Sequence, residues 1–272
     1  MPSIHPTAII GPDGDLADDV EIGPWCSLAG RVTLGPRCRL LGNVYLQGPL
    51  AVGAGNTFYP FVCLGFDPQD LSYVRPEDGG VGIAMGCDNT LRESVTIHAA
   101  TGQHPTTIGD GNLLMVNCHF GHDAILGNRC IVANGTLVAG HVEIADDVVF
   151  GGNATVHQFC RIGRLSMISG LHGVGKDVPP FCMVRDTRRV ASLNLVGLRR
   201  AGLRKHIKPL GQAFDLLYRQ KLPNRTAAER IEKELGDDPL CWEFARFAQT
   251  TQRGITPYAP PRDAERTPAA KE

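Results

Sequence analysis

The fold is decided by residues 108–174, IGDGNLLMVNCHFGHDAILGNRCIVANGTLVAGHVEIADDVVFGGNATVHQFCRIGRLSMISGLHGV. Every sixth residue of this stretch is apolar: Ile108, Leu114, Phe120, Leu126, Val132, Val138, Ile144, Phe150, Val156, Ile162, Ile168 and Val174. We call these the hexad residues. A period of six fits neither an amphipathic helix nor an alternating strand, and repeats of this kind are typical of a parallel β-helix. The sequence therefore predicts a mainly β solenoid.

The same period runs from Ile4 to Leu64, and a short piece resumes it at Met85, Leu91 and Ile97. Four residues after most hexad residues stands a small or β-branched residue, which predicts a second inward position. Gly often follows the hexad residue directly, as at Gly23, Gly65 and Gly127. We expect these glycines to supply conformational freedom at tight corners.

Composition narrows the class of protein. The chain has 272 residues, 43% of them apolar and 20% charged, and its formal net charge of −1 gives no argument for binding nucleic acid. Five of the nine cysteines occupy the second inward position, where Cys acts as a small hydrophobe: Cys26, Cys38, Cys118, Cys130 and Cys160. We therefore expect no disulfide framework, which favours a reducing compartment. The sequence shows no leader peptide and no apolar run of membrane-spanning length, so it predicts a cytoplasmic protein.

The period predicts the domain organisation. Residues 1–186 form the β-helix, interrupted by loop excursions at 66–83 and 99–107. Residues 187–254 form an α-helical C-terminal domain, in which apolar spacing predicts one helix within 192–221 and another over approximately 239–252. Between them a capping-box pattern from Thr226 to Glu229 predicts the start of a further helix. The prolines and charges of residues 255–272 are typical of a disordered tail.

Four histidines share one side of the predicted solenoid. Three sides of six residues close one coil, so Ile97, Phe120, Val138 and Val156 stack in four successive coils if the second excursion is an insertion. Each is followed within three residues by a histidine: His98, His122, His141 and His157. Since neighbouring coils lie about 4.8 Å apart, we expect a column of imidazoles. Asp70 leaves the same side in the first excursion.

Such a column suits two kinds of chemistry. In acyl transfer, a His base deprotonates a substrate hydroxyl that attacks a thioester. Asp123 directly follows His122 and could fix its tautomer. Imidazoles from two subunits could instead bind zinc, with His119 and His122 as the first candidates. These two residues stand at different positions relative to their preceding hexad residues, so we expect different environments, favour acyl transfer and predict no metal ligand. Because a solenoid groove lacks a lid, we also expect a homo-oligomer.

The runs IHPTAII, NTLRESVTIH, NLLMVNCHFGHD, GNRCIVAN, VAGHVEI and TVHQFCRIG, followed by DVPP, resemble the UDP-N-acetylglucosamine O-acyltransferase family over nearly the whole chain. The resemblance implies a left-handed parallel β-helix that assembles as a homotrimer. It also implies transfer of a 3-hydroxyacyl chain from acyl carrier protein to the 3-hydroxyl of UDP-N-acetylglucosamine, the first step of lipid A biosynthesis. No cofactor is implied beyond the phosphopantetheine arm of the carrier protein.

The resemblance implies roles for individual residues. His122 is the general base, Asp123 its orienting partner, and the Gly140 N–H stabilises the oxyanion. Gly170 stands where the family gauges acyl length, and its missing side chain would leave room for a longer chain. Substrate contacts are implied for the following residues, the last two of them near the nucleotide diphosphate: Asp70, His98, His141, His157, Gln158, Asn194 and Arg200.

Two positions depart from the family pattern. Ser72 replaces a lysine of the first excursion, where the nearby Arg75 is a possible substitute, and Ala201 replaces the second of two arginines. Both concern phosphate or carrier contacts, so they motivate one alternative, a catalytically silent paralogue that binds a sugar nucleotide. The other alternative is a metal enzyme like a γ-type carbonic anhydrase. Residues 185–221 hold ten Lys or Arg against two Asp, which suits an acidic carrier protein and a diphosphate.

Overall fold

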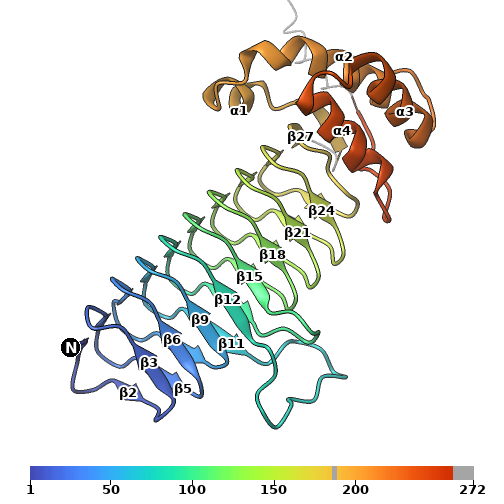
Figure 1. The fold of residues 1–272 in the computed structure, drawn as a ribbon. Helices are drawn as coiled ribbons and strands as arrows, with labels where there is room; N and C mark the ends of the chain where they lie inside the picture. Colours follow the sequence, from blue (N-terminus) through green and yellow to red (C-terminus); the bar gives the residue numbers. More distant parts are fainter. Residues whose placement is uncertain (186–188, 260–272) are drawn as a thin grey trace, which may run out of the picture.

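The chain winds into a parallel β-helix that ends beneath a group of helices, as Figure 1 shows for this computed structural model. The structure describes residues 1–185 and 189–259. Three sheets form the sides of the solenoid, and each coil contributes one short strand to each sheet. All described strand pairs are parallel except the last pair of one sheet. The predicted fold class is confirmed.

Side A is an eleven-stranded sheet in the described part of the chain: β1 (Ser3–Ile4), β4 (Glu21–Ile22), β7 (Arg39–Leu40), β10 (Thr57–Phe58), β13 (Thr90–Leu91), β16 (Leu113–Leu114), β19 (Ile131–Val132), β22 (Val149–Phe150), β25 (Met167–Ile168), β27 (Cys182–Arg185) and β28 (Arg189–Leu193). Side B has nine strands: β2 (Ile9–Ile10), β5 (Ser27–Ala29), β8 (Tyr45–Gln47), β11 (Cys63–Phe66), β14 (Thr96–His98), β17 (His119–Phe120), β20 (Leu137–Val138), β23 (Thr155–Val156) and β26 (Gly173–Val174). Side C has eight: β3 (Gly14–Leu16), β6 (Val32–Leu34), β9 (Leu50–Val52), β12 (Ile83–Met85), β15 (Thr106–Ile108), β18 (Ile125–Leu126), β21 (Glu143–Ile144) and β24 (Arg161–Ile162).

The hexad residues form the core. On side B, Ile97 pairs in register with Phe120, Phe120 with Val138, and Val138 with Val156, and these four are at most 3% exposed. The five inward cysteines are buried as well. The register confirms that these hexad residues stack on one side. Each side chain of the core therefore rests on its counterparts in the neighbouring coils.

The glycines after the hexad residues serve a different purpose from the one expected. A Cβ on Gly23 would lie 2.4 Å from the Leu41 carbonyl oxygen, and one on Gly127 would lie 2.5 Å from Asp146 Oδ1. These glycines provide space for the next coil, and of the three examples above only Gly65 has a positive φ. The left-handed conformation falls instead on the third residue after the hexad residue, for example His141 with φ 57°. The expectation of conformational freedom was therefore wrong at most of these positions.

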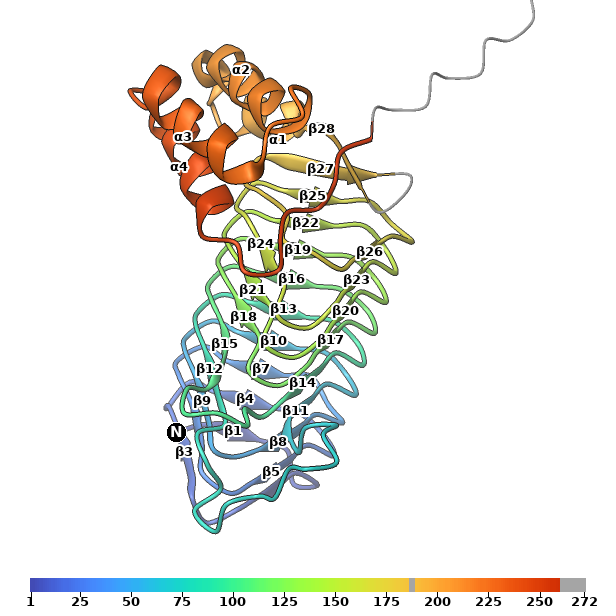
Figure 2. The ribbon, with the colours of Figure 1, turned by 90° about the vertical axis from the view of Figure 1, so that its right-hand side faces the viewer.

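Both excursions leave the solenoid at the same corner, between sides B and C. The first connects β11 to β12 and the second connects β14 to β15 in the next coil. In the following three coils, this corner is made by residues 121–124, 139–142 and 157–160. The long loops and the histidine-bearing turns therefore line one edge of the molecule (Figure 2).

The C-terminal part differs from the prediction in three places. The single helix expected within 192–221 is divided into two α-helices and a 3₁₀ turn. Residues 189–193 form β28, antiparallel to β27, so the helices begin only afterwards. Thr226 lies inside a helix that starts at Asn224 after Pro223, and no capping box forms. The helices are α1 (Leu195–Arg200), η1 (Arg204–His206, a 3₁₀ turn), α2 (Ile207–Tyr218), α3 (Asn224–Leu235) and α4 (Pro239–Gln249). None of the described helices is both long and apolar enough to cross a membrane.

Part of the expected tail belongs to the fold. Ile255 and Tyr258 form β-bridges with Asp177 and Val190, and Ile255 is only 7% exposed. Hydrogen bonding to the last coil therefore orders residues 255–259. The remainder of the expected tail, residues 260–272, and the expected domain boundary at 186–187 lie outside the described residues.

A charge in the core should unfold the coil. Val138 is 0% exposed, and Val138→Asp would place a carboxylate there without a partner, so we expect a loss of at least about 3 kcal/mol of stability. The neighbouring Leu137 is 48% exposed, so Leu137→Asp is the matched control for folding. Thermal unfolding followed by circular dichroism measures both. Equal melting temperatures for the two variants would contradict this account of the core.

Candidate functional site

The corner between sides B and C holds a cavity of about 390 Å³. It lies between the first excursion and the turns that follow β17, β20 and β23. The side chains and backbone that line it include Gln69, His98, His119, His122, Gly140 and Gln158. The structure thus brings four of the predicted site residues together and adds Gln69 and His119.

His122 and Asp123 form a dyad. His122 Nδ1 lies 2.7 Å from Asp123 Oδ2, and the two side chains are only 17% and 10% exposed. If Nδ1 carries the proton that this contact needs, Nε2 presents its lone pair. Nε2 would lie 2.7 Å from a Cβ built on Gly140, so this nitrogen is aimed at Gly140. The arrangement is that of a general base held by a carboxylate.

The second excursion fixes Asp123. Its carboxylate accepts hydrogen bonds from the Thr101 hydroxyl at 2.6 Å and from the Thr101 and Gly102 N–H groups at 2.9–3.2 Å. Burial by itself would raise the pKa of Asp123, but the hydrogen bonds from Thr101, His122 and Gly102 outweigh it and hold that pKa below its usual range. The carboxylate is therefore ionised at neutral pH. Thr101 and Gly102 carry no sequence motif that pointed to this task.

Gly140 and Gly121 leave a backbone donor accessible. Among the hydrogen bonds of the described residues, the Gly140 N–H donates none. A Cβ on Gly121 would lie 2.7 Å from that nitrogen, so only glycine at position 121 leaves it uncovered. An N–H without an internal acceptor, beside a candidate base, suits the stabilisation of a developing oxyanion. The GHD run at 121–123 was the signal that could have identified Gly121.

His119 is a site residue whose environment the sequence analysis predicted wrongly. It projects outward from β17, one residue before Phe120, and lines the same cavity as His122. Its ring packs edge-on against His98 with 4.7 Å between centroids, and Nδ1 lies 2.8 Å from the Thr96 hydroxyl. Burial, with a smaller contribution from His98, lowers the pKa of His119 to about 4. Burial and the nearby His122 also lower the pKa of His98.

The predicted column of evenly spaced imidazoles does not form. Four of the described histidines of this corner instead form two separate pairs of contacting rings. His98 contacts His119, whereas His141 meets His122 edge-on at 5.0 Å and stacks on Phe159 at 4.7 Å. His157, in the next coil, is exposed, and its Nδ1 lies 3.1 Å from the Gln158 carbonyl oxygen. The rings differ in spacing because the histidines occupy different positions within their turns.

Asp70 and Ser72 lie at the turn of the first excursion. Asp70 Oδ1 accepts hydrogen bonds from the Ser72 N–H at 2.8 Å and the Ser72 hydroxyl at 2.7 Å. These bonds, with a smaller contribution from His122, lower the pKa of Asp70. Arg75, considered as a substitute cation, donates to Asp67 and to the Gly65 carbonyl oxygen instead. The loop thus places a carboxylate near His122 and no free cation beside it.

Three of the predicted residues lie away from this corner of the solenoid. Asn194 is the N-cap of α1: its Oδ1 accepts from the Gly197 N–H at 3.0 Å, and its Nδ2 donates to the Leu165 carbonyl oxygen at 2.9 Å. Arg200 is exposed at the end of the same helix. Gly170 follows β25 at the corner between sides A and B, where a Cβ would lie 3.0 Å from the Gly152 carbonyl oxygen.

A metal ion is a chemical possibility at the dyad. One ligand atom each from His122, Asp123 and His141 lies within 4.8 Å of the others. The Asp123 carboxylate, however, already accepts from Thr101, Gly102 and His122. These bonds use the lone pairs that a cation would need. The donor set therefore fits acid–base chemistry better than metal binding.

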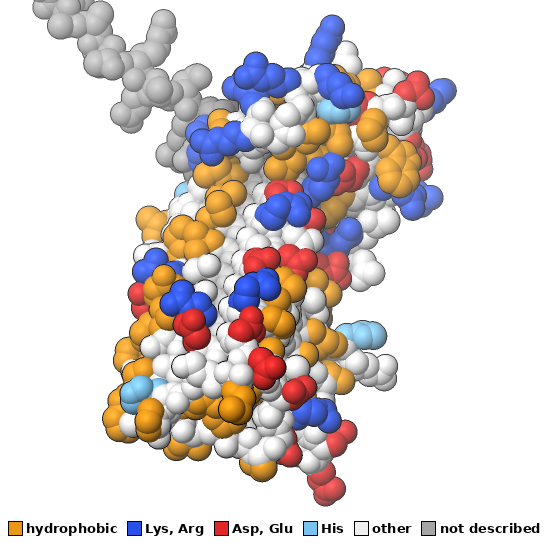
Figure 3. All heavy atoms as spheres, turned by 60° about the vertical axis from the view of Figure 1, so that its left-hand side comes forward, with side chains coloured by type: hydrophobic (Ala, Val, Ile, Leu, Met, Phe, Trp, Pro, Cys, Tyr) orange, Lys and Arg blue, Asp and Glu red, His pale blue; other side chains and the backbone are white. Residues whose placement is uncertain are grey.

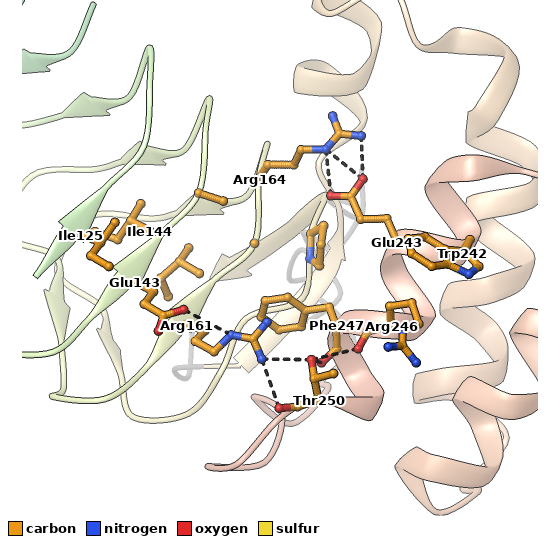
Figure 4. Close-up of a pocket in the computed structure, with 14 residues that line it drawn as sticks. Ile125, Glu143, Ile144, Arg161, Arg164, Trp242, Glu243, Arg246, Phe247 and Thr250 are labelled. Carbon is orange, nitrogen blue, oxygen red and sulfur yellow. Dashed lines mark hydrogen bonds and ion pairs between the residues drawn. The ribbon is translucent and has the colours of Figure 1, made fainter. Parts of the chain in front are cut away.

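Charge gathers on the helical end of the molecule. Figure 3 shows Lys and Arg side chains around the helices, above the mixed charges of the solenoid. A second cavity of about 420 Å³ separates α4 from side C (Figure 4). There Arg164 pairs with Glu243 at 2.7 Å, which fastens α4 to the solenoid. This cavity has a mostly aliphatic and aromatic lining and is separate from the histidines.

Comparisons with known proteins agree on one family. The family described as "Udp N-acetylglucosamine O-acyltransferase; Domain 2" matches residues 177–256, and the bacterial transferase hexapeptide repeat matches residues 105–140. An acyl-[acyl-carrier-protein]–UDP-N-acetylglucosamine O-acyltransferase of Anaeromyxobacter sp. (strain Fw109-5) is 47% identical over 93% of this chain and 99% of the relative. The corresponding Synechocystis protein is 45% identical over 91% and 90%.

Solved structures agree. The UDP-N-acetylglucosamine acyltransferase of Francisella novicida superposes with a TM-score of 0.89 at 31% identity and covers 95% of each chain. The UDP-N-acetylglucosamine O-acyltransferase of Moraxella catarrhalis gives a TM-score of 0.89 at 34% identity, over 93% of this chain and 99% of that one. These matches span both the solenoid and the helical part.

The half-buried His119 should make stability depend on pH. Its pKa of about 4 in the folded chain lies below the usual 6.5, so the unfolded chain takes up a proton first as pH falls. The contribution is complete above pH 6.5 and is lost as pH drops towards 4, by up to about 3 kcal/mol. In His119→Asn, the melting temperature should therefore fall less over this range than in the wild type. The exposed His104→Asn is the control, and parallel curves for all three proteins would contradict the assignment.

Proposed function

The chain belongs to the family of acyl-[acyl-carrier-protein]–UDP-N-acetylglucosamine O-acyltransferases, and we propose that it transfers a 3-hydroxyacyl chain from acyl carrier protein to the 3-hydroxyl of UDP-N-acetylglucosamine. This is the first step of lipid A biosynthesis. The family makes the chain an O-acyltransferase. The observation that carries the proposed mechanism is the His122–Asp123 dyad beside the free Gly140 N–H.

In the proposed reaction, His122 Nε2 removes the proton of the sugar 3-hydroxyl while its oxygen attacks the thioester carbon. Asp123 holds Nδ1–H and stabilises the imidazolium that forms. The Gly140 N–H donates to the oxyanion of the tetrahedral intermediate. Collapse breaks the carbon–sulfur bond, and the phosphopantetheine thiolate leaves and takes the proton back from His122. The two glycines support this reading, because a side chain at 121 or 140 would fill the space around the reacting groups.

The residues around the dyad are proposed to hold the acceptor. His98, Gln158 and the missed His119 line the cavity, whereas Asp70 and His141 approach His122 from the loop and the next coil. Ser72 holds the Asp70 carboxylate, so its proposed contribution to binding is through Asp70. His157 lies one coil beyond His141 and extends the same edge. The proposal needs no metal ion and no cofactor beyond the arm of the carrier protein.

Asn194 and Arg200 support an oligomer. Neither lines the histidine cavity within one chain, and the Asn194 side chain is already bonded to its own helix and to Leu165. The resemblance implies that both positions lie near the nucleotide diphosphate. We therefore propose a homotrimer in which α1 of one subunit approaches the cavity of the next. The basic helical end is the proposed docking surface for the acidic carrier protein (Figure 3). The predicted cytoplasmic location stays a prediction.

His122→Ala tests the mechanism. The side chain is outside the core, so the variant should fold, and turnover should fall by about 10²–10⁴ because the general base is lost. Purified protein is incubated with UDP-N-acetylglucosamine and 3-hydroxyacyl carrier protein, and the 3-O-acylated product is followed by mass spectrometry. His104→Ala, in the exposed part of the second excursion, is the matched control.

The same assay separates the alternatives. A silent paralogue would give no product with the wild-type chain. A metal enzyme would lose its activity on treatment with a chelator, whereas the proposed mechanism predicts the same rate with and without it. Unchanged turnover of His122→Ala would rule out the assigned base.

Gly170 should determine the acyl length. Its position has no side chain, so a long acyl chain can pass, whereas Gly170→Met should shift the preferred donor towards shorter chains. Competition between carrier proteins loaded with several chain lengths, read by product mass, measures this shift. Because even a Cβ would lie 3.0 Å from the Gly152 carbonyl oxygen, Gly170→Ala is included to separate crowding of the backbone from blocking of the chain. An unaltered product distribution in both variants would remove Gly170 from this role.

A further inference from the structure

The end of the described chain returns from α4 across the last coils of the solenoid (Figure 2). We call residues 250–259 the strap. Asp177, which is 1% exposed, anchors it: its N–H donates to the Gly254 carbonyl oxygen at 3.0 Å and its carbonyl oxygen accepts from the Thr256 N–H at 2.7 Å. Asp177 Oδ2 also accepts from the Thr251 hydroxyl at 2.7 Å. Bonds on both sides of Arg253 therefore fix its backbone.

The Arg253 side chain points at the histidine edge. Its Nη2 lies 3.4 Å from His157 Nδ1 and 3.3 Å from the Gly175 carbonyl oxygen. Its Nε is buried and has no hydrogen-bond partner among the described residues. A buried donor without a partner costs free energy, so a position that keeps one needs an explanation.

Arg253 lines a cavity of about 480 Å³ that it shares with His141, Glu143, Phe159, Arg161, Asp177, Thr250 and Gln252. The other charged residues that line this cavity already have interaction partners. Arg161 lies 3.7 Å from Glu143, donates to Thr250 at 3.2 Å and stacks on Phe247 (Figure 4). Asp177 Oδ1 accepts from the Arg161 N–H, and its other oxygen accepts from Thr251.

Arg253 is thus the one cation of this lining for which the described residues provide no carboxylate within ion-pair distance. The cavity adjoins the proposed reaction site, because His141 lines it and also contacts the ring of His122. The Arg253 guanidinium has no carboxylate partner among the described residues, and the hydrogen bonds of the strap hold its backbone beside the proposed transferase site. Such a guanidinium is suited to bind a phosphate group.

We propose that Arg253 is a further substrate-binding residue, which the strap delivers to the solenoid, and that it binds a phosphate group of a substrate. This inference rests on the proposed function, in which both substrates carry such a group. The acceptor has the diphosphate of its nucleotide, and the donor has the phosphodiester that joins the pantetheine arm to the carrier protein. The guanidinium stabilises the bound substrate and takes no part in proton transfer.

Kinetics of Arg253→Gln and Arg253→Met test this role, and Arg253→Lys is the conservative variant. The KM for one of the two substrates should rise by about 10- to 100-fold in the two uncharged variants, since hydrogen bonds to charged groups are of that strength. The kcat should stay within about threefold, and Arg253→Lys should recover part of the affinity. Arg39→Gln removes an exposed arginine of the solenoid, which pairs with Glu21, and should leave both KM values unchanged.

The substrate that responds identifies the phosphate. If it is the acceptor's, the wild type should bind UDP more tightly than uridine, and Arg253→Gln should lose that preference in a calorimetric titration. If it is the donor's, the same loss should appear between acyl-phosphopantetheine and acyl-pantetheine. These titrations do not need turnover, so they remain informative if the wild type makes no product and the proposed function fails.

Three results would overturn the inference. One is a change below about twofold in both KM values, together with unaltered phosphate preferences, in folded Arg253→Gln and Arg253→Met. Another is an equal effect in Arg39→Gln, which would show a general loss of charge. A fall in kcat alone would also contradict it, because Arg253 would then act on the chemical step.

Discussion

The structure depends on the hydrogen bonds that join each coil to the next at the spacing of neighbouring strands. Because the coils are in register, Phe120 rests directly on Val138. His122 stands two residues after Phe120, whereas His141 stands three residues after Val138 in the next coil. That offset brings the rings of His122 and His141 to 5.0 Å. The same stacking leaves little space between the turns of neighbouring coils. Glycine is needed at 121 and 140 because neighbouring turns approach too closely for a Cβ.

The His122–Asp123 dyad depends both on the repeating coils and on the two excursions that interrupt them. The turn after β17 adopts a left-handed conformation at Asp123, which places the carboxylate beside the ring of the preceding histidine. The second excursion then supplies three donors from Thr101 and Gly102 that keep the carboxylate ionised and fixed. The first excursion brings Asp70 towards the same ring. The repeat therefore positions His122 and Asp123, whereas the two excursions supply the groups that surround them during the proposed catalysis.

The helical part is joined to the solenoid at several points, and this affects what it can contribute. Arg164 and Glu243 fasten α4, Asn194 caps α1 and reaches back to Leu165, and the strap is bonded to Asp177. The strap ends the described chain over the coils next to the proposed reaction site. Hydrogen bonds to the solenoid on both sides of Arg253 therefore hold the backbone that carries its guanidinium. Through Arg253, the C-terminal part would therefore contact a substrate directly, in addition to presenting basic side chains to a carrier protein.

The sequence by itself determined the period of six, the two buried rows, the sharing of one side by Ile97, Phe120, Val138 and Val156, and the resemblance that pointed to the family. These features repeat every six residues or lie within short continuous runs of sequence, so the local pattern is sufficient to find them. Only the tertiary structure decided which outward groups meet. It paired His119 with His98, gave Asp123 its donors, tied Asn194 to Leu165 and brought Arg253 to His157. Each of these contacts joins residues of different coils or segments, and their distance depends on loop paths that no local periodicity encodes.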